Sequence, residues 1–144
     1  MSKWAGLAGL RVGYGIMNPG LVNHIVDIKS PYNVNVAAEV ALLASLEDAP
    51  ALLDNVAKIV SERDRLQVVL EDMAGITPWP SEGNFILCQL ANREEASRVY
   101  EDLASRGIFV RNFGSERLQD TFRVAIGTPD QTDAFIAALR EILK

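Results

Sequence analysis

The sequence predicts a mixed α/β protein in which the C-terminal half is a small α+β domain. From residue 76 onward, short apolar stretches alternate with segments of helical periodicity, and glycines or prolines separate them. The expected order is β-β-α-β-β-α, which is typical of a sheet with helices over one face. The length of 144 residues and the hydrophobic fraction of 49% allow a real core.

The N-terminal half is expected to contain one short strand and several helices. The Gly-rich residues 11–16 predict the strand, and residues 18–20 predict a turn before a short helix at residues 21–29. Residues 36–46 predict a helix that is apolar on most sides and therefore buried. A long helix is expected at about residues 51–73.

The long helix carries one apolar stripe, which needs a long partner surface. The stripe follows a 4-3 spacing and consists of Leu52, Val56, Ile59, Arg63, Leu66, Leu70 and Met73. Arg63 stands where an apolar residue is expected. The charged residues 62–65 are interpreted as a solvated face of the helix, and Gly75 is expected to stop it.

The C-terminal half has clear start and stop signals for its elements. The expected strands are residues 76–79, 84–90, 108–110 and 122–126. The expected helices are residues 93–106, with Gly107 as the stop, and residues 128–143. At the start of the last helix, Thr128 caps, Pro129 takes the first helical position and Gln131 completes a capping box.

The composition argues against several classes of function. The net charge of -5 disfavours nucleic acid as a partner, because phosphate backbones are bound by clustered Lys and Arg. One cysteine, Cys88, and one histidine, His24, leave neither a disulfide nor a Cys/His zinc site, and Cys88 is expected to be a buried, inert thiol. No apolar stretch reaches the roughly 18 residues that span a bilayer, and no secretory signal is recognised. We therefore expect a cytoplasmic protein without a metal or a membrane partner.

The residues from Ser2 to Gly13 suit a phosphorylated carbonyl cofactor. The chain opens directly into this Gly-rich segment, whereas domain boundaries usually fall in polar linkers, so we expect a fragment of a longer protein. A lysine such as Lys3 can react with a carbonyl if it is held close to it, and the fork of an arginine such as Arg11 matches phosphate oxygens. Small residues between them allow close approach to a flat ring. A dinucleotide fingerprint fits less well, because no strand precedes the glycines and no helix follows them.

The run Ser-Lys-Trp-Ala-Gly-Leu-Ala-Gly-Leu-Arg-Val-Gly-Tyr resembles the cofactor-lysine signature of the class I/II aminotransferases of fold type I. In that signature the lysine is followed by two residues of any type, a small residue, an apolar residue, any residue, a small residue, any residue, Arg, an aliphatic residue and Gly. The residues from Lys3 to Gly13 match this signature at every position. Among these enzymes the run is most similar to the histidinol-phosphate aminotransferases. The resemblance implies pyridoxal 5'-phosphate as cofactor, Lys3 as the cofactor lysine, and Ser2 and Arg11 as ligands of the cofactor phosphate.

Further segments extend this resemblance over essentially the whole chain, as the C-terminal two-fifths of a family member. They are residues 31–35, 81–85, 107–111 and 122–128. Strand alternation places Arg123 on the face opposite Phe122 and Val124. The resemblance implies that Arg123 pairs with the substrate α-carboxylate and that Arg111 helps to hold a substrate phosphate.

By this resemblance, residues 1–48 belong to a large cofactor domain, residues 49–75 form an interdomain helix, and residues 76–144 form the C-terminal small domain. The parent enzyme is then a homodimer that moves an amino group between L-histidinol phosphate and 2-oxoglutarate in histidine biosynthesis. The family's ligands of the cofactor ring precede the lysine, so we expect the isolated chain to be inactive. The alternatives are an aromatic or aspartate aminotransferase, a threonine-phosphate decarboxylase, or a non-catalytic α+β binding module.

Overall fold

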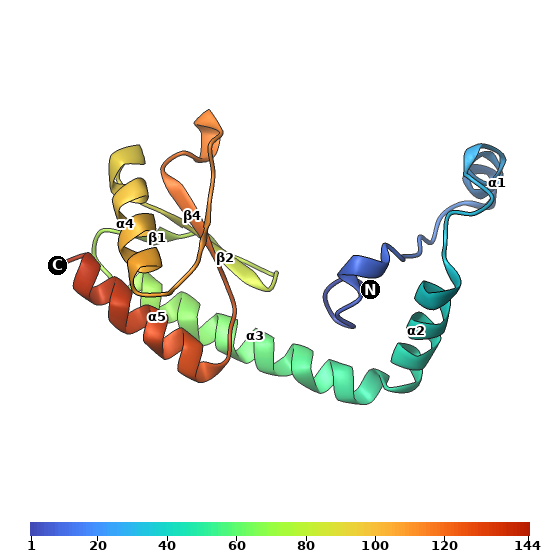
Figure 1. The fold of residues 1–144 in the computed structure, drawn as a ribbon, viewed down its shortest axis with the longest axis horizontal. Helices are drawn as coiled ribbons and strands as arrows, with labels where there is room; N and C mark the ends of the chain where they lie inside the picture. The colour runs from blue at the N-terminus through green and yellow to red at the C-terminus, as the bar shows by residue number, and fades with distance from the viewer. The chain divides into compact units, whose positions relative to one another are not determined.

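The computed structural model describes residues 1–144, which divide into two compact units, residues 1–56 and residues 57–144 (Figure 1). The boundary between the units falls inside the long helix α3, Ala49–Glu71. None of the helices is both long enough and apolar enough to cross a membrane.

The first unit is helical and contains no strand. Its elements are the short helix η1, Ala8–Leu10, the helices α1, Pro19–Ile28, and α2, Val36–Glu47, and the beginning of α3. Asparagines cap both complete α-helices. Asn18 Oδ1 accepts a hydrogen bond from the Gly20 N–H at 2.8 Å, and Asn35 Oδ1 accepts one from the Ala38 N–H at 2.8 Å. Residues 18–20 therefore start a helix rather than form a separate turn.

Two expectations for the first unit are wrong. Residues 11–16 form a turn and irregular backbone rather than a strand, because all strands that could pair with them lie in the second unit. Helix α2 forms as expected, but Ala38 is its only buried residue, and Val36 is 76% exposed. An apolar helix is buried only where another surface covers it, and no other segment of the first unit covers most of α2.

The second unit contains a four-stranded antiparallel sheet in the order β1-β2-β4-β3. Its strands are β1, Thr77–Pro78, β2, Phe85–Gln89, β3, Arg111–Asn112, and β4, Thr121–Ala125. Its other elements are the helices α4, Arg93–Ser105, and α5, Pro129–Ile142, and the short helix η2, Glu116–Leu118. The predicted β-β-α-β-β-α order is confirmed.

The third strand lies later than expected. The sequence predicts it at residues 108–110, whereas the structure has β3 at Arg111–Asn112. The N–H of Ile108 instead donates to the Leu103 carbonyl at 3.0 Å, after Gly107 adopts a φ of +78°. The N–H of Ile108, the first residue of the apolar run, is thus bonded to the end of α4 and not to a neighbouring strand. Pairing with β4 begins only at Arg111.

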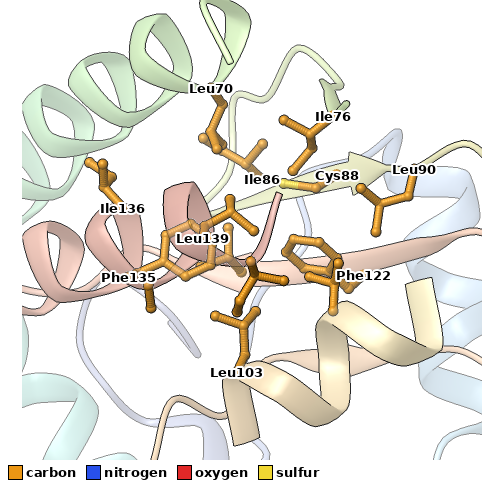
Figure 2. Packing of buried hydrophobic residues seen from close by; sticks show 14 of the residues in the cluster. Leu70, Ile76, Ile86, Cys88, Leu90, Leu103, Phe122, Phe135, Ile136 and Leu139 are labelled. Atoms are coloured by element: carbon orange, nitrogen blue, oxygen red, sulfur yellow. The ribbon is translucent and has the colours of Figure 1, made fainter. Parts of the chain in front are cut away.

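One face of the sheet is covered by α4, α5 and the C-terminal part of α3, and the core lies between them (Figure 2). Phe122 from β4 is fully buried and meets Phe135 from α5 edge to face, with ring centroids 6.4 Å apart. Leu70 of α3 and Leu103 of α4 are also fully buried in this cluster. The expected arrangement of a sheet with helices over one face is therefore confirmed, and Phe122 lies on the covered face.

Cys88 of β2 lies inside this core with no exposed surface. Burial raises the pKa of its thiol to about 12. Because the thiolate is the reactive form of cysteine, this shift leaves Cys88 unreactive at neutral pH. The prediction of a buried, inert thiol is confirmed.

The stripe of α3 is confirmed, but the charged residues 62–65 are not a simple solvated face. Glu62 and Arg63 are each only 8% exposed. Arg65 joins α3 to the N-terminal part of α5, with Nη2 2.6 Å from Glu62 Oε1 and Nη1 2.8 Å from Asp133 Oδ1. The Arg65 guanidinium is the main cause that lowers the pKa of the Glu62 carboxyl. These charges hold two helices together, which helical periodicity alone does not reveal.

Candidate active site

The uncovered face of the sheet in the second unit presents two arginines side by side. Arg123 is the central residue of β4, and its Cα partners are Leu87 on β2 and Arg111 on β3. Residues directly opposite each other in an antiparallel ladder share one face, and like charges placed this way are destabilising. Both arginines are exposed. Such a cationic pair suits an anion with more than one oxygen.

The guanidinium of Arg123 lies over an aromatic ring. Its Cζ atom is 4.9 Å from the centroid of Phe85 on β2. Neither Arg123 nor Arg111 pairs with a carboxylate of the chain through its side chain. The N–H groups of both side chains are therefore free to bind an external anion.

The three candidate cofactor ligands lie in the first unit, within its N-terminal turns. The N–H of Gly6 donates to the Lys3 carbonyl at 3.4 Å, and Gly6 has a φ of +68°, which only glycine adopts easily. The side chain of Lys3 is exposed and makes no hydrogen bond or ion pair within the chain. Ser2, directly before it, is half-buried.

Arg11 has an uncommon backbone conformation. Its φ of +53° makes it the only residue other than glycine in the left-handed region. Such residues are strained and often lie at functional sites. The Arg11 guanidinium folds back so that Nη1 donates to the Ala8 carbonyl at 3.0 Å. The turn that begins at Lys3 therefore ends at an arginine that lies at the surface.

A profile of the family described as aminotransferase class I and II matches residues 1–139. The chain belongs to this family. A relative named histidinol-phosphate aminotransferase, from Roseiflexus castenholzii, is 46% identical over 143 residues, which are 98% of this chain and 38% of the relative. The chain thus spans about two fifths of the length of the curated relative that it matches.

Two solved structures are similar to the whole chain. The histidinol-phosphate aminotransferase of Sinorhizobium meliloti, in complex with pyridoxal-5'-phosphate, has a TM-score of 0.81 and 30% identity. That match covers 99% of this chain and 39% of the other. The L-threonine-O-3-phosphate decarboxylase of Porphyromonas gingivalis has a TM-score of 0.82 and 25% identity, with coverage of 99% and 44%. These likenesses agree with the fold type I architecture predicted from the sequence.

The structure adds two features to the residues singled out from the sequence. It places Arg111 opposite Arg123 on the sheet, whereas the family resemblance implies a separate role for each. It also places Phe85 against Arg123, a contact that sequence reasoning missed. The one available signal was that Phe85 belongs to the Ser81–Phe85 segment that resembles the family, but nothing in that segment indicates its partner on β4.

Proposed function

We propose that this chain is the C-terminal part of a pyridoxal-phosphate-dependent aminotransferase. The reaction is the transfer of an amino group between L-histidinol phosphate and 2-oxoglutarate in histidine biosynthesis. The observation that carries this proposal is the pair Arg111 and Arg123, opposite each other on an uncovered sheet face. The similarity to a histidinol-phosphate aminotransferase over 98% of the chain supports it.

The residues of the N-terminal turns fit the cofactor by the chemistry of their donors. Lys3 offers an amine that no group of the chain occupies, and Ser2 and Arg11 offer a hydroxyl and a guanidinium for a phosphate. A Cβ at Gly6 or Gly9 would meet no other heavy atom within 4 Å, so the backbone between the lysine and the arginine is open to a ligand. We propose Lys3 as the covalent ligand of the cofactor, and Ser2 and Arg11 as its phosphate ligands.

Pyridoxal phosphate, when bound, supplies an electron sink that makes the bonds at the substrate α-carbon labile. Lys3 would hold the cofactor through its Nζ. In this proposal the same Nζ would also accept the proton from the substrate α-carbon and would donate it again within the site. The same residue thus holds the cofactor and moves the proton.

The two substrates present different anions to the arginine pair. The oxo acid has an α-carboxylate, whereas histidinol phosphate has a phosphorylated CH2–O group on its α-carbon in place of that carboxylate. We therefore revise the separate roles expected from the sequence. Arg123 binds the carboxylate in one half-reaction and the phosphate in the other, and Arg111 contributes the second positive charge that a phosphate dianion needs.

The remaining expectations stay proposals. They are a large cofactor domain at residues 1–48, an interdomain helix at 49–75, a small domain at 76–144, a homodimeric parent enzyme and a cytoplasmic location. Because the chain spans 38% of the relative's length, we also propose that it does not transaminate alone.

A threonine-phosphate decarboxylase is the second candidate function. It is favoured by the similarity to the decarboxylase of Porphyromonas gingivalis and by the same need for a phosphate site. A binding module without catalysis is disfavoured, because it has no use for the full signature from Lys3 to Gly13.

The decisive experiment is an assay of the full-length protein that contains this chain. We expect glutamate to form from 2-oxoglutarate when L-histidinol phosphate is the donor, faster than with phenylalanine or aspartate. Release of carbon dioxide from threonine phosphate without glutamate formation would favour the decarboxylase. No reaction with any of these substrates would contradict both candidate activities.

A further inference from the structure

The Ser81–Phe85 segment forms a small, internally bonded turn at the start of β2. Ser81 Oγ accepts a hydrogen bond from the Gly83 N–H at 3.1 Å and donates one to the Phe85 carbonyl at 2.5 Å. One hydroxyl therefore closes the turn at both ends. The proposed function assigns no role to this segment, although it resembles the family.

Gly83 brings the turn close to the aromatic ring. A Cβ at Gly83 would lie 3.4 Å from Phe85 Cε1, at the near limit of ordinary contact. On β4 the Cα partner of Phe85 is Ala125, which has a small and exposed side chain. Gly83 therefore lies against one side of the ring. The ring also contacts Arg123, which is the diagonal neighbour of Phe85 on β4.

Arg123 Cζ lies over the face of the Phe85 ring, and no N–H of the Arg123 side chain donates to a group of the chain. In a cation–π arrangement the flat guanidinium lies over the ring, while its N–H donors point outward in their own plane. A carboxylate of the chain would instead accept hydrogen bonds from those N–H donors, and no carboxylate of the chain pairs with Arg123. The 4.9 Å contact with Phe85 can thus fix the orientation of Arg123 without competing with a substrate anion.

We propose that Phe85, at the end of the Ser81–Phe85 turn, is a positioning residue that orients Arg123 for binding substrate anions. This inference rests on the proposed function of Arg123. Phe85 acts through Arg123 and has no chemical step of its own. Its effect is therefore on the binding of carboxylate and phosphate groups.

The kinetic test compares substitutions at Phe85 in the full-length enzyme. Phe85→Leu keeps an apolar side chain and removes the ring, so it should lower kcat/KM for 2-oxoglutarate and for the phosphorylated donor by about tenfold, mainly through KM. Phe85→Tyr keeps the ring face and should stay within about twofold of the parent enzyme. Phe109→Leu is the matched control, because Phe109 is 82% exposed and does not stack on Arg123.

A spectroscopic test examines the contact in the 144-residue chain itself. The Arg123 Nε–H proton should be shifted upfield by the ring current of Phe85. The shift should disappear in Phe85→Leu and persist in Phe85→Tyr and Phe109→Leu. An unshifted Arg123 signal in the parent chain would overturn the proposed stacking even if every variant is well folded.

Arg123→Lys separates the two proposals. If Arg123→Lys raises KM for both substrates and Phe85→Leu does not, the positioning role of Phe85 is wrong while the anion site stands. If neither substitution changes KM, the proposed anion site is itself wrong. If Phe85→Leu and Phe109→Leu lower activity equally, the effect is general and the positioning role is again wrong.

Discussion

The two units of the chain differ in how completely they bury their own apolar side chains. Residues 57–144 enclose a continuous cluster in which Leu66, Leu70 and Phe122 are at most 1% exposed. In residues 1–56 the only buried hydrophobic residues are Val12 and Ala38. Both units have a strong apolar pattern in their sequence. They differ in whether the two surfaces that pack together to form a core both belong to the same unit.

This difference separates the core of the chain from the proposed cofactor lysine. The second unit has a sheet and the helices that cover it, so it contains the whole of its core. The first unit has apolar helices with exposed faces, and it also has the proposed cofactor lysine. We propose that the part of the longer relatives that this chain does not span covers those faces in the full-length protein.

The largest expected effect concerns the first unit. In the full-length enzyme, Lys3→Ala should lower kcat by at least about 10²–10⁴-fold, because it removes the group that moves the proton. Borohydride reduction should attach a pyridoxyl group to the peptide that contains Lys3, as mass spectrometry can determine. A pyridoxyl group on Lys29 or Lys58 instead would contradict the assignment.

The contrast in burial can be tested with matched leucines in the isolated chain. Leu70 in α3 is fully buried, so Leu70→Ala should lower the free energy of unfolding by about 2–5 kcal/mol. Leu43 in α2 is 56% exposed, so Leu43→Ala should change it by no more than about 0.5 kcal/mol. Urea unfolding followed by circular dichroism measures both. Equal destabilisation would show that the first unit has a core of its own.

The proposed anion site predicts an effect on binding rather than on folding. Arg123→Lys keeps the charge and loses the bidentate fork, so it should weaken transition-state binding by about 2–4 kcal/mol. Steady-state kinetics of the full-length enzyme should show a higher KM for both the oxo acid and the phosphorylated donor. If only thermal stability falls, Arg123 is a structural residue and the site is assigned wrongly.

The smallest expected effect concerns the link between α3 and α5. Mainly because Arg65 holds the carboxylate, the pKa of Glu62 is lower in the folded protein than in the unfolded chain. The ionised Glu62 carboxylate therefore stabilises the folded protein fully above the unfolded pKa of about 4.3. This stabilisation is lost as the pH falls through the lowered pKa of Glu62 in the folded protein. Since the pair is partly open to solvent, Glu62→Gln should remove no more than about 1 kcal/mol at pH 7.

The control for this prediction is Glu101→Gln, in which an exposed helical glutamate without an ion pair is neutralised. Denaturant unfolding at a series of pH values should show a weaker acid dependence for Glu62→Gln than for the parent chain, and no such change for Glu101→Gln. An identical acid profile for all three proteins would mean that the Glu62–Arg65 pair contributes nothing to stability.

Local patterns predicted most of the helices and the order of the elements. Helix starts such as the one at Thr128 depend on residues a few positions apart, and the structure has the expected bond from the Thr128 N–H to Gln131 Oε1 at 3.0 Å. Alternation along one strand likewise placed Phe122 and Arg123 on opposite faces. The prediction failed where pairing was needed, at residues 11–16, which have no partner strand in their unit.

The sequence by itself determined the helices, the β-β-α-β-β-α order, the opposite faces of β4 and the resemblance of the Lys3–Gly13 run to its family. Only the tertiary structure decided that Arg111 stands opposite Arg123, that Phe85 stacks on Arg123, and that Arg65 joins two helices. The physical reason is distance along the chain. Capping and alternation act between neighbours, whereas strand register and helix packing bring together residues that no local pattern relates.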